Sequence, residues 1–180
     1  MSRAHLFVPP LLVALSACSA TPDIAAPRQH TSYSATLPDS VIAMLPTTQR
    51  KQLELAAWGL LYTSESDYPF VYVRRNGIMR SPTAAPTIAE FRALFGISAN
   101  TPVEIITLDT FFARHIERVD PADDVAQALV PRYMNLRETL RTSLSQVVVY
   151  RVGAIAIDCY VVGFNANGDL EGMTTISIET

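Results

Sequence analysis

The hydrophobic residues of this chain follow two spacings, one typical of helices and one typical of strands. Between residues 48 and 61 they recur every three or four positions, which predicts an amphipathic helix from Thr48 to about Leu61. Trp58 lies away from the centre of the apolar face, so we expect it to be partly exposed. A capping box at residues 87–90 predicts a second, shorter helix that ends at Gly96.

Two further helices are predicted in the middle of the chain. Asp109 is suited to cap a helix that carries Phe111-Phe112. Asp120-Pro121-Ala122-Asp123 marks another helix start, since proline is tolerated in the first position and an acidic residue there favours the helix dipole. That helix runs towards Leu144. We expect Pro131 to kink or split it, because proline removes a hydrogen bond and clashes with the preceding turn.

The remaining apolar runs are short and rich in β-branched residues, which is typical of strands. The predicted strands are 70–73, 103–107, 147–152, 154–164 and 170–179. Short turns separate the last three, so they should form a meander. Both faces of the 154–164 strand are largely apolar, which indicates helices on both sides of the sheet. We therefore predict an α+β fold, a three-layer α/β/α sandwich around a mixed, mainly antiparallel sheet with a C-terminal β-meander.

The first 17 residues resemble a lipoprotein signal peptide. Their apolar run is shorter than the roughly 20 residues that span a membrane. Leu15-Ser16-Ala17-Cys18 is similar to the bacterial lipobox, in which the cysteine is lipidated and becomes the new N-terminus. A plain secretory signal cut near Ala17 or Ala20 is the alternative. Ser19 after the cysteine is typical of outer-membrane lipoproteins, so we expect a lipid-anchored envelope protein facing the periplasm.

Composition divides the rest of the chain into a tether and one domain. Residues 18–46 are rich in Ala, Thr, Ser and Pro and predict a flexible tether that starts at the lipidated Cys18. Residues 47–180 are long enough for one domain with its own core. If Cys18 carries lipid, Cys159 is the only thiol left, so no intramolecular disulfide can form. Cys159 lies in an apolar strand and is predicted to be buried.

Several kinds of function are disfavoured by the sequence. The net charge is −3 and Lys51 is the only lysine, so direct nucleic-acid binding is not expected. The chain has no His-x-x-x-His, no Cys-x-x-Cys and no glycine-rich phosphate loop, so we predict no metal site of its own, no cofactor and no catalysis. His115 lies in an amphipathic helix and is interpreted as a structural or an exposed histidine. Asp158, inside an apolar strand, should be buried with a partner such as Arg151.

An acidic, hydroxyl-rich segment lies between the first predicted helix and the first predicted strand. It reads Leu-Leu-Tyr-Thr-Ser-Glu-Ser-Asp-Tyr-Pro-Phe over residues 60–70. Composition alone indicates an ordinary turn, in which serine and aspartate side chains bond the local backbone and Glu65 is solvated. The last predicted strand runs to Thr180, where we expect a free carboxylate.

Together with other segments, this motif resembles the nuclease A inhibitor-like family, the inhibitors of sugar-non-specific nucleases. The resemblance covers most of residues 50–180. The other segments that carry it are 109–112, 149–153, 158–163, the hairpin at Gly168 and Glu179-Thr180. It implies a protein that blocks a sugar-non-specific ββα-metal endonuclease, rather than an enzyme.

The resemblance also implies which residues contact the nuclease. In the family, the glutamate of the motif and the C-terminal threonine project into the partner's active site, and these positions match Glu65 and Thr180. Their carboxylates can imitate phosphate oxygens, with Thr180 approaching the partner's Mg²⁺ and Glu65 pairing with an arginine. Ser64 belongs to the same motif. Asp67 either adds a third anion or caps its own turn, and Glu179 should point to the opposite face of the strand.

Two departures from the family pattern bear on inhibition. Val71 stands where family inhibitors often carry an acidic residue, and Arg74 and Arg75 follow close behind. A basic cleft would repel both arginines if they lay at the contact. The alternative function is therefore an envelope lipoprotein that keeps the fold but binds another protein or serves structurally. In either case we expect a monomer.

Overall fold

The structure is a computed structural model that describes residues 48–76 and 83–180. The predicted signal peptide (1–17), the tether (18–46) and Cys18 lie outside the described residues. No helix in the described part of the chain is long and apolar enough to cross a membrane. In chain order the elements are α2 (Thr48–Ala57), β1 (Leu61–Thr63), β2 (Asp67–Pro69), β3 (Val71–Arg75), α3 (Ile88–Phe95), β4 (Val103–Ile106), α4 (Leu108–Ile116), α5 (Asp124–Ser143), β5 (Ser145–Val152), β6 (Ala156–Phe164) and β7 (Leu170–Ile178).

Five strands form one sheet in the order β3-β7-β6-β5-β4. The consecutive strands β5, β6 and β7 are neighbours, so the predicted C-terminal meander is confirmed, as is the α+β class. Every pair among the described strands is antiparallel, which corrects the predicted mixed sheet, because β3 and β4 each run opposite to the one strand they pair with. The description as a three-layer sandwich stays a prediction.

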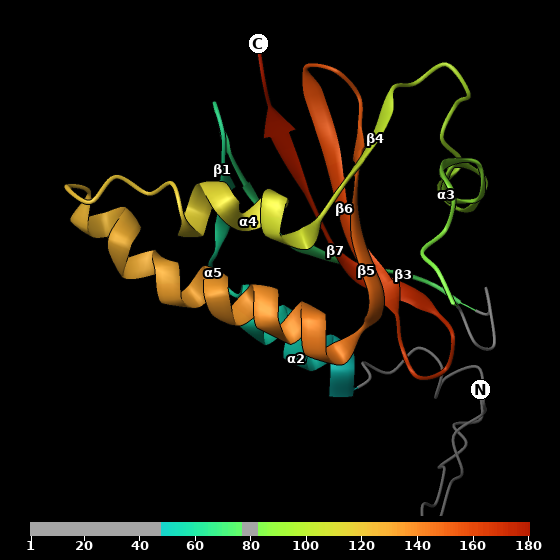
Figure 1. Ribbon diagram of the computed structural model, residues 1–180, viewed down its shortest axis with the longest axis horizontal. Coiled ribbons are helices and arrows are strands. Elements are labelled where there is room, and N and C mark those ends of the chain that lie inside the picture. Colours follow the sequence, from blue (N-terminus) through green and yellow to red (C-terminus); the bar gives the residue numbers. More distant parts are fainter. Residues whose placement is uncertain (1–47, 77–82) are drawn as a thin grey trace, which may run out of the picture. The chain divides into compact units, whose positions relative to one another are not determined.

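Helices contact both faces of this sheet. Figure 1 shows α2, α4 and α5 on one side and α3 on the other. Side chains of the meander alternate between two apolar clusters, as the period of a strand requires. The first cluster unites α2, α4 and α5 with sheet residues that include Val149, Ile157, Cys159, Val161 and Met173. The second surrounds Phe91 of α3 and includes Tyr150, Val152, Val162, Phe164 and Leu170.

The first helix is shorter than predicted. It ends at Ala57 instead of near Leu61. Gly59 follows with a φ of +66°, a left-handed conformation that stops the helix and turns the chain. Residues 61–63 form β1 instead. Trp58 is 78% exposed, so the prediction for its side chain is confirmed.

Two helix caps lie elsewhere than predicted. Thr107, not Asp109, caps α4, with its hydroxyl accepting from the Thr110 N–H at 3.1 Å. Asp109 lies in the first turn of α4 and binds Arg141. Asp123 caps α5 three residues beyond the predicted start, and the Asp120-Pro121 segment precedes the helix. The capping box of α3 and its end at Gly96 are as predicted.

Pro131 does not split α5. The helix continues from Asp124 to Ser143 through the proline. A proline removes one backbone hydrogen bond from the helix interior. Leu136 and Leu140 are fully buried in the first apolar cluster, and this packing holds the helix against the sheet.

Two residues of strand β6 were predicted to be buried, and one of these predictions is wrong. Cys159 is fully buried, and burial raises the pKa of its thiol to about 11, so it is an inert core residue. Asp158 is exposed and is not the buried carboxylate that its apolar neighbours predicted. Its side chain points away from the core because it alternates with Ile157 and Cys159. Arg151 binds Glu104 and Glu179 instead.

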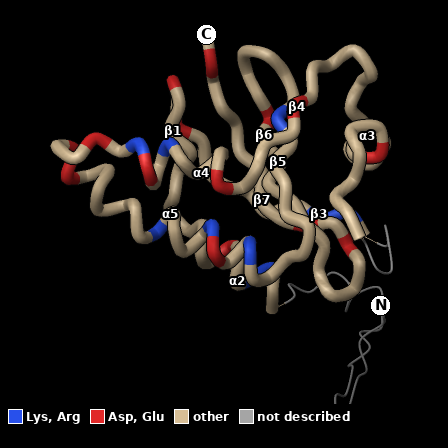
Figure 2. Tube along the Cα trace, in the orientation of Figure 1, with Lys and Arg blue, Asp and Glu red and all other residues tan. Residues whose placement is uncertain are grey.

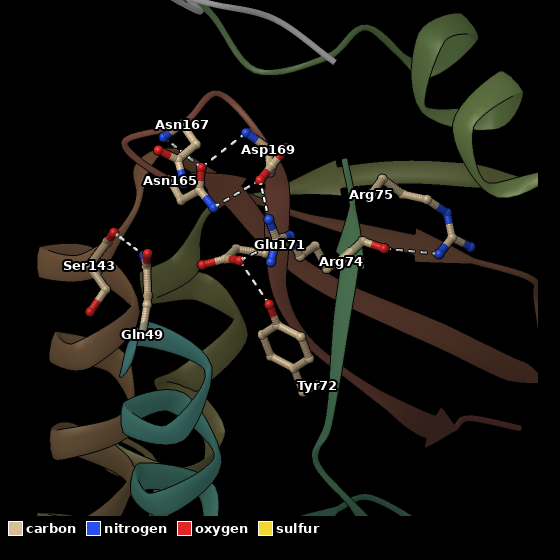
Figure 3. Close-up of polar contacts among 9 residues, drawn as sticks. All are labelled: Gln49, Tyr72, Arg74, Arg75, Ser143, Asn165, Asn167, Asp169 and Glu171. Carbon is tan, nitrogen blue, oxygen red and sulfur yellow. Dashed lines mark hydrogen bonds and ion pairs between the residues drawn. The ribbon is translucent and has the colours of Figure 1, made fainter. Parts of the chain in front are cut away.

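The fully buried carboxylate belongs to Glu171 in β7 (Figure 3). The Tyr72 hydroxyl donates to Glu171 Oε2 at 2.7 Å, and the Arg74 guanidinium lies 3.9 Å from the same oxygen. Arg74 also binds Asp169, which accepts from Asn165 as well. This buried polar cluster joins β3 to the β6–β7 hairpin at the end of the sheet where Arg75 pairs with Leu170.

Candidate functional site

The acidic segment that the sequence predicts as a turn is a small antiparallel hairpin. Strands β1 and β2 pair Leu61 with Pro69 and Thr63 with Asp67. Side chains of α4 and α5 form hydrogen bonds with the backbone of this hairpin. The Tyr133 hydroxyl donates to the Leu61 carbonyl at 2.6 Å. The Thr63 N–H donates to Nε2 of His115 at 3.0 Å.

The tip of the hairpin, Ser64 to Ser66, is bound to the end of β7. Ser64 Oγ accepts from the Ile178 N–H at 2.9 Å and donates to the Ser66 carbonyl at 3.0 Å. The Glu65 N–H donates to the Ile178 carbonyl at 3.4 Å. Ser64 therefore both closes the turn and fixes the tip beside the last strand.

This arrangement brings Glu65 and Thr180 into direct contact. The Glu65 carboxylate accepts from the Thr180 N–H at 3.0 Å, and the Thr180 hydroxyl lies 2.8 and 2.9 Å from its two oxygens. Both residues are exposed. The carboxylate is thus held in one position at the surface although no cation balances it in the described contacts. Their role as contacts to a nuclease stays a prediction.

The other two acidic candidates differ in their surroundings. Asp67 is exposed in β2 opposite Thr63, and the serines rather than Asp67 close the turn. Glu179 accepts from Ser177 at 2.9 Å and from Arg151 at 2.6 Å. Burial alone would raise the pKa of Glu179, but these hydrogen bonds and the Arg151 charge lower it. The charge of Glu179 is therefore already balanced by Arg151, whereas no ion pair among the described residues balances the charge of Glu65.

A cavity of about 590 Å³ lies against the tip and is lined by both Glu65 and Thr180. Its wall includes Arg114, which reaches the Thr63 carbonyl at 3.4 Å, and the buried His115. Burial, with a smaller contribution from Arg114, lowers the pKa of His115 to about 4. The imidazole is therefore neutral near pH 7, accepts from Thr63, and is structural as predicted.

Within residues 48–76 and 83–180, no group of three or more His, Cys, Asp or Glu side chains is arranged to hold a metal ion. Acidic residues mark both the hairpin end and the segment that leads to the C-terminus (Figure 2). The tip is therefore a surface with hydrogen-bond acceptors and negative charge. Such a surface suits a cationic partner.

A comparison with protein-family models matches residues 47–180 to the model described as nuclease A inhibitor-like protein. The chain belongs to the nuclease A inhibitor-like family. A search of curated proteins returned no match. Since the matched residues cover the whole described domain, the hairpin tip and the end of β7 both lie within the region that the family shares.

Of the residues in which this family member departs from the family pattern, Val71 follows the base of the hairpin, whereas Arg74 and Arg75 lie away from the tip. Arg74 and Arg75 pair with Glu171 and Leu170 at the start of β7, whereas Thr180 follows the end of that strand. Ile178 lies seven positions after Glu171, which is about 23 Å along a strand. Both arginines are also engaged, Arg74 with Asp169 and Arg75 with the Leu94 carbonyl at 3.1 Å. They do not place positive charge at the tip.

Sequence reasoning missed the contacts that shape this site. The pairing of Thr63 with His115 joins residues 52 positions apart, and that of Glu65 with Thr180 joins residues 115 positions apart. The motif predicted that Ser64 and Glu65 matter but not what they bind. A hydroxyl-rich turn with Tyr62 and Tyr68, residues that favour strands, on either side was the available signal for a hairpin.

Proposed function

We propose that this chain inhibits a sugar-non-specific endonuclease of the ββα-metal class by covering its active site. The hairpin tip and the end of β7 enter the nuclease cleft as one unit. Glu65 takes the place of a substrate phosphate and pairs with an arginine of the partner. The carboxylate at Thr180 approaches the partner's Mg²⁺ directly or through its waters. The inhibitor binds as a monomer, and the metal belongs to the nuclease.

The observation that carries this proposal is the contact between Glu65 and Thr180. An exposed glutamate normally loses side-chain entropy when a partner orders it, and such ordering reduces the affinity of a complex. Here the Thr180 N–H and hydroxyl already orient the carboxylate, so less ordering remains for binding. Oxygens that accept these hydrogen bonds keep lone pairs for a cation. Family membership supports a nuclease as the partner.

Glu65→Gln should weaken nuclease inhibition on the order of 100-fold. Glutamine keeps the length of the side chain and can still accept from Thr180, but it lacks the charge that pairs with a basic cleft. The measurement is cleavage of plasmid DNA by a Mg²⁺-dependent ββα-metal nuclease, titrated with the wild-type chain and with the variant. The matched control is Glu138→Gln on α5, which removes another exposed carboxylate and should leave inhibition unchanged. Equal loss in both variants would contradict a specific role for Glu65.

The hydroxyl of Thr180 can be tested separately. Thr180→Ala removes a donor to Glu65 and should weaken inhibition roughly tenfold, the effect of losing one hydrogen bond to a charged group. Thr180→Ser keeps the hydroxyl and should retain most of the inhibition. A chain with one glycine added after Thr180 displaces the carboxylate and should inhibit poorly. Equal inhibition by all three variants would mean that this position does not enter the cleft.

We also propose that lipid on Cys18 anchors the inhibitor to the outer membrane, facing the periplasm. Two or more acyl chains are enough for stable attachment to a bilayer. Cys18→Ser should therefore move the protein from the membrane fraction to the soluble fraction of a Gram-negative host. Cys159→Ser, which changes the buried thiol, should leave it with the membranes. A Cys18→Ser protein that stays with the membranes would argue against lipid anchoring.

A further inference from the structure

An exposed apolar surface lies beside the base of the hairpin and has no role in the function proposed above. It consists of Trp58, Leu61, Pro69 and Val71, here called the Trp58 surface. The exposed fractions of Trp58, Leu61 and Val71 are 78%, 42% and 56%. These residues line a groove of about 460 Å³ between the end of α2 and the start of β3.

The backbone that presents Trp58 is well held although its side chain is exposed. The Trp58 N–H donates to the Leu55 carbonyl at 3.2 Å, and its own carbonyl accepts from Arg132. Leu61 and Pro69 are fixed opposite each other by the hairpin register. A tryptophan side chain has only two torsions to order on binding, and tryptophan is among the residues enriched at energetically dominant contacts.

The Trp58 surface is continuous with the hairpin tip. Leu61 and Pro69 form the base of the same hairpin that carries Glu65 at its end. Glu65 lies four positions after Leu61, so the two regions lie within about 13 Å along an extended chain. A typical interface of about 800 Å² on each partner is wide enough to cover both.

The tip alone lacks what stable interfaces usually contain. Its exposed groups are polar and charged, whereas the centre of a tight interface is apolar and holds aromatic anchors. We propose that the Trp58 surface is a second contact with the same nuclease that the tip engages. Its complement is an apolar patch beside the basic cleft of that enzyme. This inference rests on the proposed function, since it takes its partner from there.

Trp58→Ala in the full chain should raise the inhibition constant against the Mg²⁺-dependent ββα-metal nuclease about 30-fold, the effect of losing a dominant interface side chain. The matched control is Leu55→Ala. Leu55 lies in α2, three positions before Trp58, and is equally exposed, at 77%, but it lines a different groove with Asn135 and Thr139. It should leave inhibition unchanged. Melting temperatures of both variants should match the wild type, because neither side chain is packed in the core.

The salt dependence of inhibition should distinguish the contact at the Trp58 surface from the contact at the tip. The loss in Trp58→Ala should be the same at low and high salt, whereas the loss in Glu65→Gln should shrink as salt screens its charge. In the double variant the two losses should multiply, since sites this far apart act independently. A Trp58→Ala protein that inhibits as well as wild type, or a Trp58-dependent dimer in sedimentation, would overturn the inference.

The outcomes also distinguish the two proposals. Inhibition that is lost in Glu65→Gln and retained in Trp58→Ala would leave the proposed function intact and remove only the second contact. Inhibition that depends on Trp58 and not on Glu65 would support the Trp58 surface and contradict the anion mimicry of the tip. A wild-type chain that does not inhibit the nuclease would overturn both proposals.

Discussion

Arg74→Ala is expected to lower the free energy of unfolding by about 3–5 kcal/mol, the usual effect of breaking a buried ion pair by removing one partner. The Arg74 guanidinium lies 2.5 Å from Asp169 and 3.9 Å from the fully buried Glu171 (Figure 3). Burial alone would lower the pKa of Arg74, but the hydrogen bond and the charge of Asp169 raise it. The cation is thus strongly coupled to these carboxylates.

Few other contacts compensate for the buried charge on Glu171. The Tyr72 hydroxyl donates to Glu171 Oε2, and burial together with this bond raises the pKa of Tyr72. Within the described residues, Glu171 Oε1 and Arg74 Nε have no hydrogen-bond partner. Removal of the guanidinium would therefore leave a carboxylate in the sheet with one donor, and a buried charge without its cation is costly.

Urea unfolding of the wild type and of Arg74→Ala measures the change in the free energy of unfolding directly. The neighbouring Arg75→Ala is the matched control, because Arg75 lies on the same strand and is exposed. Arg75 lies over the Phe95 ring at 4.6 Å and binds the Leu94 carbonyl. Its loss should change stability by no more than about 1 kcal/mol. Equal stabilities of the two variants would show that the buried polar cluster contributes nothing beyond surface pairing.

The second large effect is a loss of stability in mild acid that arises from His115. The pKa of His115 is about 4 in the folded domain and about 6.5 in the unfolded chain. A lowered folded pKa means that the unfolded state binds the proton more readily. The contribution of neutral His115 to the free energy of unfolding is therefore complete above pH 6.5 and is lost as the pH falls from there through 4. A shift of this size corresponds to about 3 kcal/mol.

The surroundings of His115 explain why the protonated form is unfavourable. Its ring packs between the rings of Tyr62 and Tyr133, with distances between ring centroids of 4.7 and 4.6 Å. Its Nε2 accepts from the Thr63 N–H. A proton on Nε2 would break that hydrogen bond and place a charge beside Arg114. Asp67 acts in the opposite direction but does not outweigh burial.

His115→Gln provides the test, because glutamine can accept from Thr63 but does not titrate. The free energy of unfolding, measured between pH 7 and pH 4, should fall less steeply in the variant than in the wild type. Glu179 contributes in a lower range, since its folded pKa is below 4.5 and its contribution is lost only as the pH falls through that value. Parallel curves for the two proteins would contradict a buried neutral histidine.

Local features of the fold could be predicted because their causes lie within a few residues. The capping box at Thr87 and the αL end at Gly96 were both found from sequence. The meander followed from short turns between β-branched runs. Helix ends were less accurate. Asp123 lies three positions after Asp120, and either can cap a helix, so only packing decides which one does.

Burial of charged residues was predicted poorly for a related reason. Apolar neighbours surround Asp158 in sequence, yet its side chain points outward. Glu171 sits in an unremarkable stretch of β7 and is fully buried, because Tyr72 and Arg74 approach it from β3. Those partners are almost a hundred residues away. The pattern along one strand gives its period but not which strand will lie beside it.

The sequence by itself determined the class of the fold, the apolar faces of its helices and strands, and, through the motif at residues 60–70, the family to which the chain belongs. These properties depend on local periodicity and on residue identity. Only the tertiary structure decided that Glu65 is held by Thr180 and that Arg74 lies at the far end of the sheet. Such contacts follow from strand order and register, because antiparallel pairing brings residues together according to their place in the sheet and not their distance along the chain.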